Sequence, residues 1–186
     1  MPKVSNPYRL DRNVLPQSYD LWIEPDLASF TFEGRASIWI RAAKSFRSVT
    51  LHALEINVRQ AALMTVEGVR VGASAIRYNE KFETVTIAFN RNFSPQEVAS
   101  LELEFAGILN DKMHGFYRTS YEHQGRKTWG AATQFEATDA RRAFPCWDEP
   151  DMKAVFKVTL RVPKELTALS NMPVKEVVAK KKKKEI

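Results

Sequence analysis

Residues 30–40 read FTFEGRASIWI and alternate between apolar and polar side chains for almost their whole length. In an extended chain successive side chains point to opposite faces, so this segment has one apolar face and one polar face. The apolar face holds Phe30, Phe32, Ala36, Ile38 and Ile40, and the other holds Thr31, Glu33, Arg35, Ser37 and, just beyond, Arg41. The pattern predicts a β-strand that packs one face on a core and leaves the other in water.

The same period of two recurs along the chain, in residues 19–23, 85–89, 101–105 and 154–162. Helical periodicity is weak: only SPQEVA (94–99) resembles even a single helical turn. Short turn signals such as Glu67-Gly68 and Asn79-Glu80 separate the strands. Because a sheet with one apolar face needs a second layer, we expect a mainly β fold of antiparallel strands, either a sandwich or a broad curved sheet.

With 186 residues, 44% of them hydrophobic, the chain is long enough to bury a core of its own. No internal repeat or glycine-rich linker divides it. We expect a disordered start over residues 1–5 and one β domain over residues 6–173. The basic segment 174–186 is expected to be either a continuation of that domain or a tail.

Charge and hydropathy exclude several classes of protein. The formal net charge is +6, but the run Lys180 to Lys184 supplies five of these charges and is read as a solvated segment, so the body is near neutral and a nucleic-acid partner is not expected. No stretch approaches the roughly 18 apolar residues that cross a bilayer, and no membrane partner is expected. The first residues, MPKVSNPYRL, lack the apolar stretch of a secretory signal. A single cysteine, Cys146, fits a reducing compartment, and we expect a cytoplasmic protein.

Two tryptophans break the alternation. Trp22 and Trp39 lie on the otherwise polar faces of their strands. Either a second layer covers them or they face a partner. We expect burial, because tryptophan supplies a large packing area wherever two layers meet.

The alternation stops between Lys127 and Leu160, where charged and aromatic residues crowd an irregular stretch. A rigid β scaffold often presents its functional side chains on such a loop. Within it, Asp139, Arg141, Arg142, Asp148 and Glu149 alternate in charge over about ten residues. We interpret these five residues as a salt-linked support that holds the loop rigid.

The string TQFEATDARRAFPCWDEPDMKAVF (133–156) is similar to the signature that ends the N-terminal domain of M1-family zinc aminopeptidases, in particular the puromycin-sensitive and tricorn-interacting-factor-like members. Further stretches resemble the family in the same order: NPYRLDRNVLPQSYDLWIEPDL (6–27), FTFEGRASIWI, LHALEI (51–56), LNDKMHGFYRTSY (109–121) and SNMP (170–173). The resemblance covers nearly the whole chain.

This resemblance implies a saddle-shaped β-sandwich domain that leans on a thermolysin-like catalytic domain of the same polypeptide. In the family, the glutamate at the position of Glu136 helps to bind the free α-amine of peptide N-termini, and the glutamine at the position of Gln134 lines the pocket for the first side chain. The Glu136-Ala137 peptide bond is expected to be cis. From the sequence pattern alone, Glu136 would instead be read as a solvated carboxylate or as an ion-pair partner of Arg141 or Arg142.

Neither the HExxH motif, which with a downstream glutamate binds zinc in this family, nor GxMEN occurs in the chain. His52, His114 and His123 have no metal-ligand spacing, and Cys146 is flanked by aromatic residues like a packed apolar thiol. We expect no catalytic and no metal-binding residue here. Zinc would belong to the catalytic domain of the parent enzyme, and the chain alone should be inactive.

Two other hypotheses remain open. The chain could be a stand-alone β-sandwich module that binds a protein or a glycan through Trp22, Trp39 and the charged loop. It could also be a homologue that kept the domain and lost the enzyme. Binding assays with the isolated chain distinguish the stand-alone module from the aminopeptidase domain. The module should bind its ligand by itself, whereas the aminopeptidase domain should have negligible affinity for peptides until the catalytic domain is present.

Overall fold

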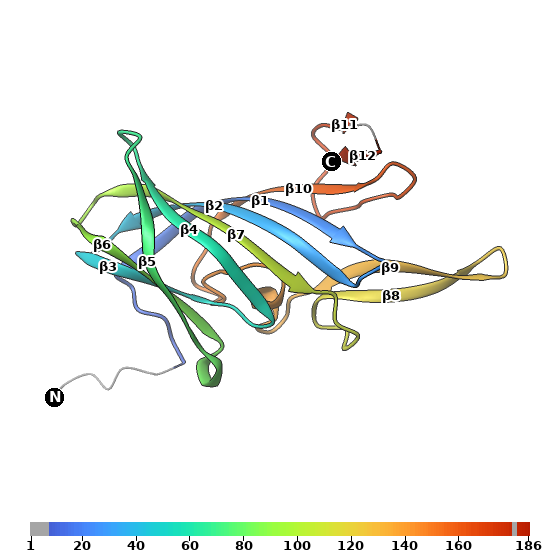
Figure 1. Cartoon of the computed structure of the whole chain (residues 1–186), viewed down its shortest axis with the longest axis horizontal. Coiled ribbons are helices and arrows are strands. Elements are labelled where there is room, and N and C mark those ends of the chain that lie inside the picture. Colours follow the sequence, from blue (N-terminus) through green and yellow to red (C-terminus); the bar gives the residue numbers. More distant parts are fainter. Residues whose placement is uncertain (1–7, 180–181) are drawn as a thin grey trace.

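A computed structural model describes residues 8–179 and 182–186, so the expected disordered start at 1–5 and the first two lysines of the run lie outside the described residues. In this part the chain is mainly β, as predicted, with two short 3₁₀ turns, η1 (Glu80–Phe82) and η2 (Ala140–Arg142), and no α-helix (Figure 1). The strands are β1 (Val14–Asp26), β2 (Thr31–Ala42), β3 (Phe46–His52), β4 (Ile56–Thr65), β5 (Arg70–Asn79), β6 (Thr84–Phe93), β7 (Val98–Ile108), β8 (Gly115–His123), β9 (Arg126–Gln134), β10 (Val155–Pro163), β11 (Val178–Ala179) and β12 (Lys183–Glu185).

The main sheet has the strand order β11-β12-β10-β1-β2-β7-β4-β5-β6-β3. β4 and β5 are paired only where residues 62–64 meet residues 70–72, after which the two strands separate (Figure 1). The sheet folds over at this point, so that β3 and β6 bury Leu51, Val85 and Ile87 in the same core as the apolar faces of β2 and β7. The expected two-layered β architecture is therefore confirmed.

The apolar face predicted for residues 30–40 forms the centre of this core. Phe32, Ala36, Ile38 and Ile40 are all at most 2% exposed. Phe32 pairs with Gly107 on β7, and Gly34 pairs with Phe105. A Cβ at either glycine would lie within 2.5 Å of the facing ring, so each glycine makes room for the aromatic side chain of the neighbouring strand.

Strand β10 differs from the prediction in two ways. It pairs in parallel with β1, with Tyr19 opposite Phe156, and not in the expected antiparallel sense. Parallel neighbouring strands cannot be joined by a tight turn. The long connection between β9 and β10 lets the chain return and enter β10 in the same direction as β1. Its predicted apolar face is also not dry: Phe156 is 50% and Val158 40% exposed, because no layer of the described residues covers this edge.

The expectation that both tryptophans are buried under a second layer is wrong. Trp39 is 42% exposed. Trp22 is half-buried, but it is covered by the guanidinium groups of Arg35 and Arg161, 5.0 and 5.8 Å from its ring centre, and not by another sheet.

Strands β8 and β9 form a separate two-stranded sheet that extends from the body as an arm (Figure 1). The base of the arm is held by apolar contacts: the Phe116 ring lies 5.2 Å from that of Phe32, and the Trp129 ring lies 4.8 Å from that of Phe30. Gln134, the last residue of β9, pairs with Gly115 at this base. Residues 127–134 were expected to belong to the irregular stretch but form most of strand β9. The irregular part begins after Gln134, where the arm joins the body.

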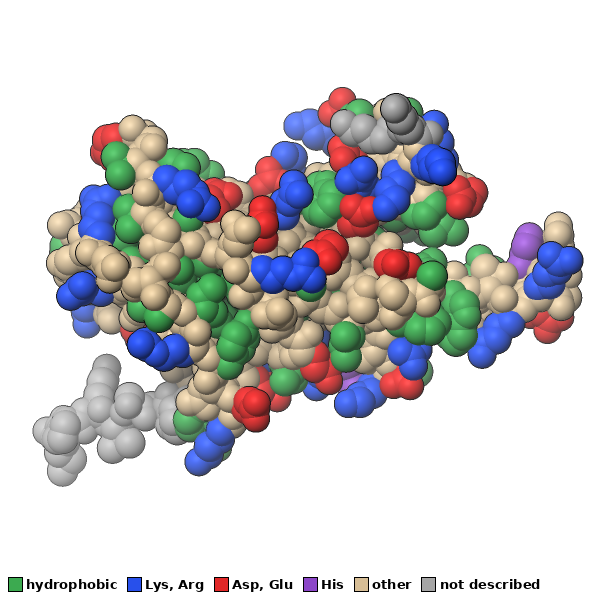
Figure 2. Space-filling view, in the orientation of Figure 1, with side chains coloured by type: hydrophobic (Ala, Val, Ile, Leu, Met, Phe, Trp, Pro, Cys, Tyr) green, Lys and Arg blue, Asp and Glu red, His purple; other side chains and the backbone are tan. Residues whose placement is uncertain are grey.

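The basic segment is more structured than a solvated run. Lys183 and Lys184 belong to β12, which pairs with β10, and Lys183 forms an ion pair with Glu24. On the face shown in Figure 2, positive and negative side chains are interspersed. No helix in the described part of the chain is long and apolar enough to cross a membrane.

Candidate functional site

The two residues expected to meet a substrate lie at the exit of β9. Gln134 ends the strand, and Glu136 follows in a turn that closes when the N–H of Asp139 donates to the carbonyl of Phe135 at 2.9 Å. The Glu136-Ala137 peptide bond is cis, as expected. Both side chains are exposed, and within the described residues neither makes a hydrogen bond or an ion pair. Glu136 is therefore not the partner of Arg141 or Arg142.

The residue between them anchors the turn. The ring of Phe135 packs edge-on against Phe144 at 5.9 Å, and Phe144 in turn contacts Tyr19 and Phe156 at 6.0 and 6.1 Å. Phe135 is still 36% exposed. The turn thus rests on an aromatic cluster that connects it to β1 and β10.

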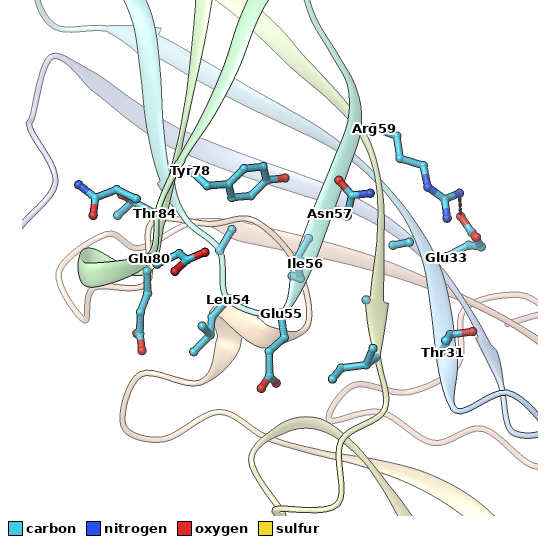
Figure 3. A pocket seen from close by; sticks show the side chains of 16 residues that line it. Thr31, Glu33, Leu54, Glu55, Ile56, Asn57, Arg59, Tyr78, Glu80 and Thr84 are labelled. Atoms are coloured by element: carbon cyan, nitrogen blue, oxygen red, sulfur yellow. Dashed lines mark hydrogen bonds and ion pairs between the residues drawn. The ribbon is translucent and has the colours of Figure 1, made fainter.

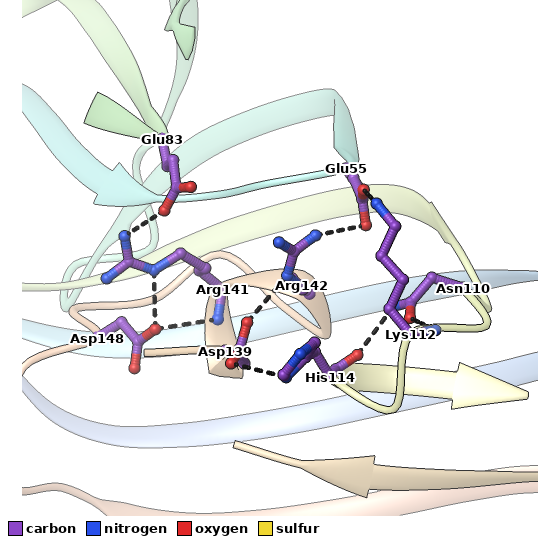
Figure 4. Close-up of polar contacts among 9 residues, drawn as sticks. All are labelled: Glu55, Glu83, Asn110, Lys112, His114, Asp139, Arg141, Arg142 and Asp148. Carbon is purple, nitrogen blue, oxygen red and sulfur yellow. Dashed lines mark hydrogen bonds and ion pairs between the residues drawn. The ribbon is translucent and has the colours of Figure 1, made fainter. Parts of the chain in front are cut away.

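Arg142 joins the turn to the body of the domain. Its Nε donates to Oδ1 of Asp139 at 2.9 Å, and its Nη1 lies 2.7 Å from Oε2 of Glu55 (Figure 4). Burial disfavours the charged guanidinium, but the hydrogen bonds to Glu55 and Asp139 outweigh it and raise the pKa of Arg142. Asp139 also faces Nδ1 of His114 at 3.5 Å.

Arg141 makes a second, more buried connection. Its side chain is 9% exposed, and it donates from Nε to Asp148 at 2.9 Å and from Nη1 to Glu83 at 2.8 Å. Its carbonyl accepts the N–H of Leu54 at 2.9 Å. Arg141 and Arg142 therefore bind η2 to the turns that contain Glu83 and Glu55, some 60 to 90 residues earlier in the chain.

The end of the loop is held by the N-terminal segment. Glu149, whose side chain is 7% exposed, accepts from Nη2 of Arg12 and from the N–H of Leu10, each at 2.7 Å. All five residues predicted to support the loop thus make ion pairs, but only Arg142 with Asp139 and Arg141 with Asp148 pair within the set. Sequence analysis missed Glu55, Glu83 and Arg12, although the LHALEI stretch noted for its resemblance contains Glu55.

His52, from the same LHALEI stretch, docks the middle of the loop. Its N–H donates to the carbonyl of Cys146 at 2.8 Å, the N–H of Cys146 donates back at 3.1 Å, and the N–H of Asp148 donates to Nδ1 of His52 at 3.2 Å. Burial and the positive charge of Arg141 lower the pKa of His52 to about 4, against the opposing effect of Asp148, Glu149 and Glu83. The imidazole is thus a neutral acceptor at pH 7.

This arrangement predicts an acid-sensitive stability. In the unfolded chain His52 takes up its proton near its ordinary pKa of about 6.5, whereas in the folded chain it stays neutral down to about 4. The unfolded state therefore binds more protons in this window, and stability falls as the pH drops through it. Between pH 7 and pH 5 the loss from this group is expected to be about 2 kcal/mol.

Urea unfolding at the two pH values measures the effect. The matched variant is His52→Asn, whose amide oxygen can accept the same hydrogen bond but does not titrate. Its stability should fall by about 2 kcal/mol less than that of the parent chain over the same interval. Equal losses in the two proteins would contradict the assignment of His52 as the titrating group.

Gly115 is required where the arm meets η2. Its φ of 65° lies in the left-handed region, and a Cβ there would lie 2.3 Å from Cβ of Arg142 and 3.0 Å from the carbonyl oxygen of Asp139. Since Gly115 is also the strand partner of Gln134, it lets the end of β9 and the ion-paired turn approach each other closely.

A separate hollow of about 740 Å³ opens where β4 and β5 diverge (Figure 3). Its lining includes Glu33, Arg59 and Tyr78, and Tyr78 reaches across the gap to accept the N–H of Val58 at 2.6 Å. Neither Gln134 nor Glu136 lines it. Glu55 and Glu83 belong to its wall, so the hollow and the loop share the two carboxylates that hold the arginines.

The histidines and the cysteine do not assemble into a metal site in the part of the chain that the structure describes, where no group of three or more His, Cys, Asp or Glu residues could hold an ion. His114 lies beside Asp139, and His123 ends β8 at the far end of the arm. Nδ1 of His52 already accepts a hydrogen bond from the loop, from the N–H of Asp148. Burial raises the pKa of the Cys146 thiol, which leaves it protonated and unreactive at pH 7.

Comparison with known proteins identifies the domain. The family model described as the peptidase M1 N-terminal domain matches residues 15–186. The chain is 43% identical over 171 residues to "Aminopeptidase M1" of Arabidopsis thaliana, covering 90% of this chain and 19% of that protein. It is 44% identical over 182 residues to the "Alanine/arginine aminopeptidase" of Saccharomyces cerevisiae, covering 94% of this chain and 20% of that protein. "Aminopeptidase 2" of Candida albicans is 42% identical over 170 residues, which cover 91% of this chain and 18% of that protein. The chain thus spans about a fifth of the length of these relatives, and it belongs to the peptidase M1 family as an N-terminal domain.

Proposed function

We propose that this domain helps a zinc aminopeptidase to hold the N-terminal end of its peptide substrate. Glu136 binds the substrate's α-ammonium group, and Gln134 lines the pocket for the first side chain. The observation that carries the proposal is the free carboxylate of Glu136, exposed on a turn whose neighbours are fixed by ion pairs on one side and aromatic contacts on the other.

The chemistry of an exopeptidase calls for such a group. The enzyme must measure from the chain terminus, so it needs an anion at a fixed distance from the metal that polarises the first peptide carbonyl. A carboxylate interacts with an ammonium group more strongly than an amide does. The five support residues, Asp139, Arg141, Arg142, Asp148 and Glu149, hold this anion in place and do not touch the substrate.

The zinc ligands lie, in this proposal, in a catalytic domain of the same polypeptide outside the present chain. Relatives named aminopeptidases that are about five times longer support this. The domain alone is then expected neither to cleave peptides nor to bind them tightly. We place the whole protein in the cytoplasm, where the unpaired thiol of Cys146 stays reduced.

The test combines gene sequence and assay. The reading frame beyond Ile186 should encode GxMEN and HExxH with a downstream glutamate. The complete protein should cleave an aminoacyl anilide but not its N-acetylated counterpart, and a chelator should abolish the cleavage until zinc is returned. Cleavage of the acetylated compound at an equal rate would contradict recognition of the α-amine.

A second candidate function rests on a different observation. Trp39 is 42% exposed on β2, and exposed tryptophan is common where proteins bind other proteins or glycans. A stand-alone binding module would retain its ligand affinity as an isolated chain and would lose it in Trp39→Ala. A stop codon soon after the lysine run, with no hydrolytic activity, would favour this candidate over the aminopeptidase.

A further inference from the structure

We infer that Glu55 is a positioning residue for Glu136. It acts through Arg142 and Asp139 to fix the turn that presents the amine-binding carboxylate. The inference rests on the proposed function of Glu136 and adds a residue from the turn between β3 and β4, some 80 residues earlier in the chain.

Three consecutive contacts connect the two glutamates. Oε2 of Glu55 lies 2.7 Å from Nη1 of Arg142, and Nε of Arg142 donates to Oδ1 of Asp139 at 2.9 Å (Figure 4). The N–H of Asp139 then donates to the carbonyl of Phe135 at 2.9 Å, which closes the turn around Glu136. Each step is a short hydrogen bond or ion pair, so a displacement at Arg142 is passed directly to the turn.

The far end of this path is rigid. Glu55 directly follows Leu54, whose N–H is bonded to the carbonyl of Arg141, and the strand before it ends at His52, which is paired with Cys146. The side chain of Glu55 is 26% exposed, so its charge is only partly screened by water. Figure 3 shows Glu55 pointing away from Tyr78, out of the hollow that it borders.

The backbone of Glu55 provides an independent indication. Its φ is 58°, in the left-handed region where glycine or asparagine is favoured and a glutamate is disfavoured. A glycine would fit this turn with less strain but would remove the carboxylate that pairs with Nη1 of Arg142, which would leave Asp139 as the remaining ion-pair partner of that arginine. A residue held in a disfavoured conformation at such a place points to a role for its side chain.

Glu83 provides the internal comparison. It is also in the left-handed region, with a φ of 53°, and it binds Arg141 at 2.8 Å. Arg141, however, bonds onward to Asp148 and not to the turn at 135–139. Glu83 therefore braces the far part of the loop, and its loss should affect Glu136 less than the loss of Glu55.

The experiment uses the complete protein and two competitive inhibitors: an amino acid amide with a free α-amine and the same amide without the amine. In Glu55→Gln the inhibition constant of the first should rise about tenfold, while that of the second stays unchanged. The KM of a free-amine substrate should rise with kcat held within about twofold, because the ammonium contact is present in both ground state and transition state. In a double mutant with Glu136→Ala, the Glu55 change should add no further loss.

The matched control is Glu33→Gln. Glu33 lines the same hollow and forms an ion pair of 2.7 Å with Arg59, but it has no contact with the loop, so both inhibition constants should stay at the parent values. If Glu55→Gln does not fold, Arg142→Lys replaces it, since lysine keeps the charge but not the two-pronged geometry.

The outcomes separate the two proposals. Loss of amine selectivity in Glu136→Ala with none in Glu55→Gln overturns the positioning role and leaves the proposed function standing. An equal rise of both inhibition constants in Glu55→Gln, or an effect that adds to that of Glu136→Ala, also overturns it. Unchanged amine selectivity in Glu136→Ala itself would overturn the proposed function.

Discussion

Replacing Glu136 by alanine in the complete protein is expected to lower kcat/KM for a free-amine peptide by about a hundredfold, which corresponds to about 2.7 kcal/mol. If the proposed function holds, the carboxylate makes a charge-assisted hydrogen bond with the substrate's ammonium group, in a cleft where neither ion is well hydrated. Steady-state kinetics with an aminoacyl anilide measure the effect. Since no described residue depends on Glu136 for a hydrogen bond or ion pair, thermal stability should stay unchanged.

Glu122→Ala is the matched control for this variant. Glu122 is an exposed carboxylate near the end of the arm, so its removal changes the net charge equally but leaves the loop untouched. The control should retain the parent kcat/KM. Glu136→Gln should lose most of the activity lost in Glu136→Ala, because an amide offers no negative charge. Parent-like kinetics in Glu136→Ala would remove the basis of the proposed function.

The fold was largely predictable from local pattern, because alternation decides which side chains share a face. The strand at 30–40 packs the predicted residues in the core, with Ile38 and Ile40 at most 1% exposed. Alternation does not decide which strand lies alongside. The parallel pairing of β10 with β1 depends on the path of the connecting chain, and the exposure of Phe156 depends on whether a layer covers that edge of the sheet. A local alternation of apolar and polar residues predicts neither.

The candidate site was predictable to the same extent. The family resemblance predicted the cis peptide bond, and the charge pattern of the motif predicted the five residues that make ion pairs, but neither predicted the turn after Gln134. The partners Glu55 and Glu83 come from turns and Arg12 from the segment before β1, all far away in the sequence, and no spacing rule connects them to the motif. Only the fold brings these residues within 3 Å of the charged groups of the loop. The left-handed φ of Glu55 and Glu83 cannot be detected in a hydropathy pattern.

The loss of Arg141 is expected to be the most destabilising change in the loop. Arg141→Ala should lower the free energy of unfolding by about 3 kcal/mol, because it leaves the carboxylate of Asp148, 11% exposed, without a counter-charge. Glu83 is 39% exposed and can be rehydrated, which keeps the loss at the lower end of the range for buried pairs. Urea unfolding of the purified chain measures it.

Arg59→Ala is the control, since it also removes one arginine and one ion pair. That pair is 51% and 55% exposed on its two sides, so its loss should cost less than about 1 kcal/mol. The cause of the Arg141 effect is tested by adding Asp148→Asn. If the unpaired buried charge is responsible, the double mutant should be more stable than Arg141→Ala alone, because the second change removes the stranded charge. A double mutant less stable than either single mutant would instead mean that each side chain contributes packing of its own, and the loop would then be held by shape more than by charge.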